Sequence, residues 1–186
     1  TPGSERARRD ALARSLESPL HITLVQGISR GERMDLTLQK ATELGVGRVV
    51  PVAMQRTVVK LSERRAQTRL AHWRAVVAQA CQQCGRNRLP EVEPAVAFDA
   101  WLASHEATDL DLVLTPNAEP LKPDSKPTTL TLVIGPEGGL AERESRALHE
   151  HGFAGLALGP RILRTETAAL AGIAVAQSRW GDFQTP

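Results

Sequence analysis

The 186-residue sequence has no tyrosine, three phenylalanines and two cysteines. So few aromatic rings argue against a stacking platform for single-stranded nucleic acid, and two cysteines cannot build a disulfide scaffold. No segment approaches the roughly 20 consecutive apolar residues of a membrane span. The polar, Arg-rich first residues do not resemble a signal peptide. With 41% apolar residues, the chain is predicted to be a globular cytoplasmic protein with no membrane partner.

Several common catalytic motifs are also missing. The sequence contains no P-loop, no G-x-G-x-x-G dinucleotide motif and no G-x-S-x-G nucleophile elbow. Cys81 and Cys84 form a C-x-x-C pair, but zinc needs four ligands and no second cysteine pair exists. Both cysteines fall on the apolar stripe of a predicted helix. We therefore interpret them as buried small hydrophobic residues and predict no metal.

Charge is divided unevenly along the chain. Residues 1–90 carry 16 Lys and Arg against 7 Asp and Glu, a net charge of +9, whereas residues 91–186 carry 7 against 14, a net charge of −7. Of the 23 basic residues, 19 are arginine. Guanidinium groups suit phosphates and base edges. The basic half therefore favours a nucleic-acid partner over an ordinary solvated surface.

Apolar periodicity predicts that strands alternate with helices over residues 20–186. The expected strands are 20–25, 48–52, 56–60, 110–114, 130–134 and 156–158. The expected helices are 29–44, 62–84, 99–105, 141–151 and 168–180. This alternation is typical of an α/β domain with a parallel sheet. Residues 1–19, which start with Thr1 rather than methionine, are interpreted as a linker or the remnant of a preceding unit.

Polar residues and glycines predict where these helices begin and end. Ser29 and Glu32 have the spacing of a capping box. Predicted N-terminal caps of later helices are Ser62, Asp99 and Thr165, and predicted stops are Gly45 and Gly85. The last helix is apolar almost all round, which predicts burial on every side.

Two loops stand out because each follows a predicted strand and precedes a helix. They are residues 134–139 (IGPEGG) and 158–167 (LGPRILRTET). In open α/β sheets ligands bind at this edge, and glycines let the backbone approach a ligand closely. Backbone groups there would read an adenine or a ribose. The alternative is a pair of tight turns with capping residues, but the arginines and glutamate in the second loop exceed what a turn requires.

Five segments together resemble one enzyme family. They are 29–34 (SRGERM), 39–46 (QKATELGV), 83–87 (QCGRN), 134–139 and 158–168. In this order they resemble the RsmE family, the ribosomal RNA small-subunit methyltransferases of the SPOUT superfamily. The resemblance runs from about residue 18 to the C-terminus. Members of this family methylate N3 of one uridine in 16S ribosomal RNA.

The resemblance implies a fold and partners that periodicity does not show. The fold would be a SPOUT-type α/β parallel sheet with a C-terminal trefoil knot, which general rules of chain topology would not predict. The cofactor would be S-adenosyl-L-methionine, and the enzyme would be a homodimer acting on 16S rRNA or the small ribosomal subunit. Residues 20–186 would form the methyltransferase domain. Residues 1–19 would be at most the tail of the family's N-terminal PUA-like barrel.

The resemblance also implies site residues. The cofactor-binding residues would be Leu114, Thr115, Gly135, Glu137, Gly139, Leu158, Gly159, Ile162, Leu163, Thr167 and Ala168. The candidates for RNA contact are Arg30, Arg33, Arg56, Lys60, Gln83 and Arg86. The expected catalytic residues are Arg164 and Glu166.

Methyl transfer to a ring nitrogen requires the two atoms to be held in line, and uridine N3 must lose a proton. Arg164 would hold the uracil oxygens or an RNA phosphate and stabilise the developing anion. Glu166 would orient Arg161 or Arg164, accept the proton, or only stabilise the helix N-terminus. Two other functions stay open at this point: a SPOUT methyltransferase with another RNA target, such as tRNA, and a non-catalytic RNA-binding module in ribosome assembly.

Overall fold

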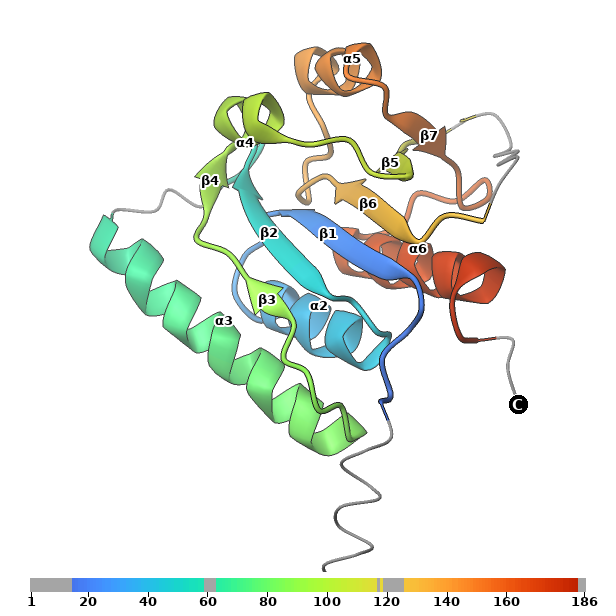
Figure 1. The fold of residues 1–186 in the computed structure, drawn as a ribbon. Coiled ribbons are helices and arrows are strands. Elements are labelled where there is room, and N and C mark those ends of the chain that lie inside the picture. The colour runs from blue at the N-terminus through green and yellow to red at the C-terminus, as the bar shows by residue number, and fades with distance from the viewer. Residues whose placement is uncertain (1–14, 59–62, 117, 119–125, 184–186) are drawn as a thin grey trace, which may run out of the picture.

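The computed structural model describes residues 15–58, 63–116, 118 and 126–183. Within them, seven strands form one parallel sheet in the order β3-β2-β1-β6-β5-β7, with β4 also paired to β2 (Figure 1). The strands are β1 His21–Gly27, β2 Arg48–Ala53, β3 Glu91–Val92, β4 Val96–Ala97, β5 Leu110–Leu114, β6 Thr129–Ile134 and β7 Ala154–Leu156. The predicted α/β class is confirmed. No helix of the described residues is long and apolar enough to cross a membrane.

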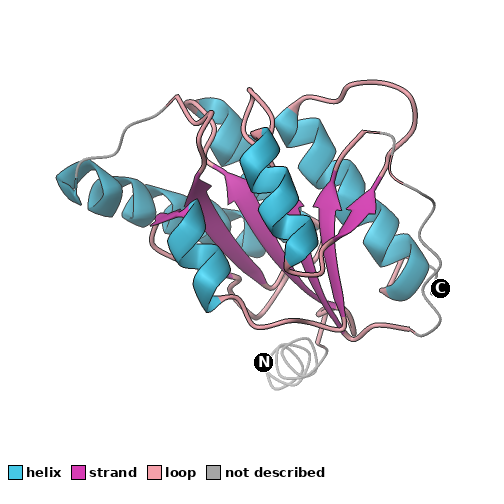
Figure 2. Cartoon of the chain, turned by 90° about the horizontal axis from the view of Figure 1, so that it is seen from above, coloured by secondary structure: helices cyan, strands magenta, loops and turns pink. Residues whose placement is uncertain are grey.

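Helices cover both faces of the sheet (Figure 2). They are α2 Glu32–Glu43, α3 Glu63–Cys84, α4 Phe98–Ser104, α5 Glu142–Glu150 and α6 Thr165–Trp180. Helices α2, α3 and α6 share one core with Ile22, Leu24 and Leu132, while α4 and α5 share the other with Val25 and Val133. Alternate strand residues thus enter opposite cores. This explains why the central strands read as nearly continuous apolar runs.

Several predicted elements differ from the structure. Helix α2 begins at Glu32 rather than at residue 29, and strands β3 and β4 were not predicted. Arg56–Val58 form a turn and irregular chain instead of a strand, and the rest of that predicted strand lies outside the described residues. Strand β7 ends at Leu156, two residues earlier than predicted, so Leu158 is in a loop. Helix α6 begins at Thr165, three residues earlier than predicted.

The capping predictions fail at three helices. Gly31, with φ of 51°, is the N-cap of α2, and the Ser29 hydroxyl instead donates to the Gly27 carbonyl at 3.4 Å. Asp99 lies inside the first turn of α4 rather than at its cap. The predicted stops at Gly45 and Gly85 are confirmed, because both have the positive φ that ends a helix. The predicted cap at Ser62 lies outside the described residues.

Helix α6 is not buried on every side. Ala168, Ala169, Ile173 and Ala176 face the core, but one side of the helix stays partly exposed. That side consists of Leu170, Ala171, Ala174 and Val175. The largely apolar sequence of α6 predicted complete burial. Within the described part of one chain, however, other residues pack against only part of the helix.

Arg86 lies inside the protein. Its guanidinium is 5% exposed, donates to the backbone carbonyls of Thr42 and Val46 at 2.8 Å each, and forms an ion pair with Glu17. These contacts attach the end of α3 to the end of α2 and to the chain before β1. Four of its five N–H donors are thus engaged within the fold, so the structure gives Arg86 an anchoring role, and its contact with RNA stays a prediction.

Arg86→Ala should destabilise the domain by about 3 kcal/mol, because it leaves a half-buried carboxylate and two carbonyls without their partner. Urea unfolding followed by circular dichroism measures this loss. Arg88→Ala is the matched control, since Arg88 is exposed two residues later. Equal stability of the two variants would contradict the anchoring role of Arg86.

Candidate active site

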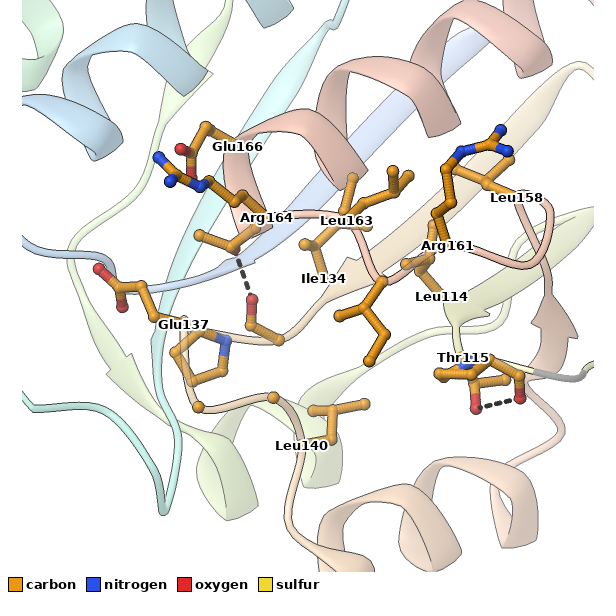
Figure 3. Close-up of a pocket in the computed structure, with 18 of the residues that line it drawn as sticks. Leu114, Thr115, Ile134, Glu137, Leu140, Leu158, Arg161, Leu163, Arg164 and Glu166 are labelled. Atoms are coloured by element: carbon orange, nitrogen blue, oxygen red, sulfur yellow. Dashed lines mark hydrogen bonds between the residues drawn. The ribbon is translucent and has the colours of Figure 1, made fainter.

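A cavity of about 750 Å³ opens at the carboxyl edge of the sheet. It lies among the chain segments that follow β5, β6 and β7 and the first turn of α6 (Figure 3). This is the edge at which open α/β sheets bind ligands, and the volume is typical of a small-molecule site. The cavity thus lies at the two glycine-containing loops for which the sequence predicted a ligand.

The cavity is lined by both apolar and polar side chains. Figure 3 shows Leu114 and Leu158 toward one end, beside Thr115 and Arg161, and Glu137, Arg164 and Glu166 toward the other. An apolar compartment beside a few polar groups is the usual arrangement of a site that binds and orients a mixed ligand.

The loop after β6 depends on its glycines. A Cβ atom at Gly135 would lie 2.9 Å from the backbone nitrogen of Leu140, so the turn closes only without a side chain. Gly139 has φ of +70°, and its N–H donates to the Pro136 carbonyl at 2.8 Å. A Cβ atom there would meet nothing nearer than Arg56 Nη1 at 4.0 Å. The backbone of Gly139 therefore faces open cavity space.

A buried hydrogen-bond network holds the first turn of α6 against this loop. The Thr165 hydroxyl donates to the Gly135 carbonyl at 2.6 Å and accepts from Gln26 Nε2 at 2.9 Å. Gln26 is fully buried at the end of β1 and also donates to the Gly27 carbonyl. The prediction that Thr165 caps α6 is therefore wrong. Its hydroxyl bonds to other segments of the fold, and Arg164 occupies the N-cap.

Glu137 connects the loop after β6 to the segment before α2. Its carboxylate accepts from the Arg30 backbone nitrogen at 2.9 Å and from Arg33 Nη1 at 3.3 Å. Burial alone would raise the pKa of Glu137, but these hydrogen bonds and the Arg33 charge outweigh it and lower the pKa. The carboxylate therefore stays ionised and keeps Arg33 at the rim of the cavity.

Comparison with known proteins identifies the family. A family model for an RNA methyltransferase domain matches residues 16–177. The ribosomal RNA small subunit methyltransferase E of Buchnera aphidicola (from Acyrthosiphon pisum) is 33% identical over 93% of this chain and 69% of its own length. The chain belongs to this methyltransferase family.

Solved structures agree with the family assignment. Methyltransferase E from Neisseria gonorrhoeae, bound to S-adenosyl methionine, is 45% identical with a TM-score of 0.84, over 90% of this chain and 70% of that one. A putative methyltransferase from Legionella pneumophila in complex with the same cofactor is 40% identical with a TM-score of 0.86, over 91% and 70%. The predicted SPOUT-type parallel-sheet fold is confirmed. The trefoil knot and the division at residue 19 stay predictions.

The cavity of this methyltransferase-family chain gathers most of the predicted site residues. The cofactor candidates that line it are Leu114, Thr115, Gly135, Glu137, Gly139, Leu158, Gly159, Ile162, Leu163 and Ala168. Thr167 does not line it and belongs to a neighbouring apolar hollow over α6. Arg164 and Glu166 line the cavity, and no ion pair joins Glu166 to Arg161 or Arg164 among the described residues. The prediction missed Ile134, Pro136, Gly138, Leu140, Pro160 and Arg161, which directly adjoin the predicted residues.

The candidates for RNA contact are scattered. Arg33 and Arg56 line the cavity, and Arg56 Nη1 donates to the Gly138 carbonyl at 2.9 Å. Arg30 is exposed beside them. Gln83 is exposed near the end of α3 but lines none of these hollows, and Lys60 lies outside the described residues.

The cysteine pair is remote from this chemistry. Cys81 is buried, as predicted, and Cys84 is partly buried. Burial raises the pKa of the Cys81 thiol although the Arg86 charge opposes the shift. Among the described residues, no three His, Cys, Asp or Glu side chains gather as a metal site would require.

Thr165→Val should cost about 2 kcal/mol of unfolding free energy, because valine removes the hydrogen-bond partner of the part-buried Gly135 carbonyl and of one N–H of the buried Gln26 side chain. Chemical denaturation measures the cost. Thr167→Val makes the same change at an exposed position two residues along α6 and should cost under about 0.5 kcal/mol. If both variants lose the same stability, the network does not hold the helix to the loop.

Proposed function

We propose that this chain transfers the methyl group of S-adenosyl-L-methionine to N3 of a uridine in 16S ribosomal RNA. The observation that carries the proposal is the cavity at the carboxyl edge of the sheet, which joins a glycine-lined, partly apolar compartment to Arg164 and Glu166. The family relationship supports the substrate, since the Buchnera and Neisseria relatives are ribosomal RNA small subunit methyltransferases E and this chain spans about 70% of their length.

The residues present fit the cofactor. Gly139 and Gly159 have positive φ and turn bare backbone toward the cavity, where a side chain would take up ligand space. Leu114 and Leu158 would pack on the adenine, and backbone groups of these loops would bind its polar edge. When bound, the cofactor supplies a methyl group already activated by its sulfonium charge.

The chain then has to position uridine and manage one proton. Arg164 is exposed at the N-cap of α6 and pairs with no carboxylate among the described residues. Its guanidinium is available for the uracil oxygens and for the negative charge that develops when N3 loses its proton. Glu166, in the first turn of the same helix, would accept that proton and also stabilise the helix N-terminus. Arg30, Arg33 and Arg56 at the rim would bind RNA phosphates.

We further infer that the enzyme is a homodimer in the cytoplasm, where ribosomal RNA is assembled into subunits. The partly exposed face of α6 continues into an apolar hollow lined by Leu156, Leu163, Ala171 and Val175. Leu163 also lines the cavity. A second copy packed on this face would cover the apolar side chains and complete the wall of the site.

Gly139→Ala should weaken the binding of S-adenosylmethionine at least about tenfold, because the added methyl group enters ligand space. Isothermal titration calorimetry measures the affinity. Gly152→Ala is the control: Gly152 also has a positive φ, of +90°, and no atom within 4 Å of a Cβ position, but it follows α5 outside the cavity.

Both glycine variants should lose about 1 kcal/mol of stability from backbone strain, and only Gly139→Ala should lose affinity. Unchanged affinity in Gly139→Ala would remove this loop from the cofactor site. Absence of any binding by the wild-type protein would refute the methyltransferase function and favour a non-catalytic RNA-binding module.

Arg164→Ala should lower the single-turnover rate about 10²–10³-fold at saturating cofactor and RNA, the usual cost of removing one preorganised donor. Cofactor affinity and melting temperature should change little, because alanine keeps the Arg164 carbonyl that accepts from the Ala168 N–H and the lost side chain has no hydrogen bond or ion pair among the described residues. Arg146→Ala, which removes an exposed arginine on α5, is the control.

A normal rate in Arg164→Ala would exclude Arg164 from the reaction. A parallel loss of stability and cofactor affinity would instead assign it a role in holding the loop. Mapping the methylated nucleotide, in naked 16S rRNA and in assembled subunits, identifies the target base.

A further inference from the structure

A second hollow adjoins the active-site cavity. It has a volume of about 520 Å³ and lies between α2 and α3. Arg33, Arg164 and Glu166 line both hollows, so the wall that separates them consists of the proposed catalytic pair and one rim arginine. Anything bound in the second hollow would therefore contact the polar end of the active site.

One stripe of α3 faces this groove. Val76 and Gln79 line the hollow opposite Leu36 and Gln39 of α2. One turn earlier along α3, His72 Nε2 lies 2.7 Å from the carboxylate of Asp35 on α2. Residues 65, 69, 72, 76 and 79 recur at spacings of three and four, so they share one side of the helix.

The same stripe ends in a group of arginines. Arg64, Arg65 and Arg69, with Thr68, surround a third hollow of about 440 Å³ on the first turns of α3. None of the three arginines pairs with a carboxylate of the described residues. Figures 1 and 2 show this end of α3 projecting beyond the rest of the domain, on the side where the central strands end. The group thus presents three guanidinium groups at this end of α3, none of them in an ion pair with the described part of the chain.

We propose that the RNA strand adjoining the target uridine lies along this stripe of α3, with its phosphates on Arg65 and Arg69 and its next nucleotide in the α2–α3 groove. The inference rests on the proposed function and extends the substrate site from the cavity to a second surface. Neither Arg65 nor Arg69 belongs to the motifs that define the active-site loops.

Length and charge both suit a single strand. From Val76 back to Arg65 the helix covers about 16 Å at 1.5 Å per residue, a distance that a few nucleotides span. Phosphates are attracted to the arginine side, whereas Glu32 and Asp35 on the α2 wall repel them. The backbone would therefore follow α3, and a base would turn toward α2.

The groove offers chemistry for that base. Leu36 is 42% exposed and lies in the same hollow as Val76, which gives an apolar surface for a base plane. The amides of Gln39 and Gln79 are donors and acceptors that match base edges. A protein partner is less well matched, since this apolar surface is small and the adjoining charge is of one sign.

The test is the double variant R65A/R69A, measured with unmodified 16S rRNA transcribed in vitro and with small ribosomal subunits. We expect the RNA dissociation constant and the KM for RNA to rise about tenfold at 0.1 M salt, and the slope of log affinity against log salt to become shallower by about 2. Cofactor affinity should stay at the wild-type value, because neither arginine lines the cofactor cavity.

The control is R143A/R146A on α5, which removes the same charge from arginines that are exposed and ion-paired to Asp99 and Glu142. It should leave RNA affinity and the salt slope within about twofold of wild type. If both double variants behave alike, the effect is one of net charge and the assignment to α3 is wrong.

The binding readout separates this inference from the proposed function. If the wild-type chain transfers no methyl group but R65A/R69A still weakens RNA binding with a shallower salt slope, the proposed function fails and the RNA surface stands. If the wild type methylates RNA and R65A/R69A keeps the wild-type KM and slope, the surface is refuted. Loss of binding to subunits alone, with normal binding to free rRNA, would refute it in favour of a contact with a ribosomal protein.

Discussion

The arrangement of the candidate active site depends on the hydrogen bonds of the Thr165 hydroxyl. This hydroxyl joins the end of β1, through Gln26, to the loop after β6, through Gly135, and to the first turn of α6. Because these groups are buried, a donor or acceptor without a partner is costly, and within this network only Gln26 Oε1 has none among the described residues. The relative position of three distant chain segments is thereby fixed, and the cavity is the space that remains between them.

Opposite charges from the two halves of the chain meet at the same place. The basic first half contributes Arg33 and the acidic second half contributes Glu137, and their contact joins the segment before α2 to the glycine loop. Arg56 adds a bond to the Gly138 carbonyl. Arg164 lacks such a partner within the described chain, and so it is free to act on a substrate. The basic residues of the chain therefore differ in role: Arg33 and Arg56 hold loops through these contacts, whereas Arg164 lines the cavity without an ion pair among the described residues.

The sequence predicted the location of the site because parallel strands impose it. Segments 134–139 and 158–167 each follow a strand, and the carboxyl ends of parallel strands share one edge of a sheet. The turns predicted from glycine and proline in these segments are observed. Gly139 and Gly159 have positive φ values that few other residues adopt. The burial of Cys81 was predictable for a similar reason, because helical spacing alone places it on the apolar stripe.

The sequence by itself therefore determined the α/β class, most strand positions, the helix stops and the two loops that line the cavity, all of which follow from local spacing and backbone preference. Only the tertiary structure decided what individual polar side chains do. Arg33 and Arg86 each follow a glycine within two residues, yet one lies at the cavity rim and the other is buried against Glu17 and two carbonyls. Thr165 looked like a helix cap, but its partners are 30 and 139 residues away. Such roles depend on hydrogen-bond partners brought together by folding, which local sequence preference does not encode.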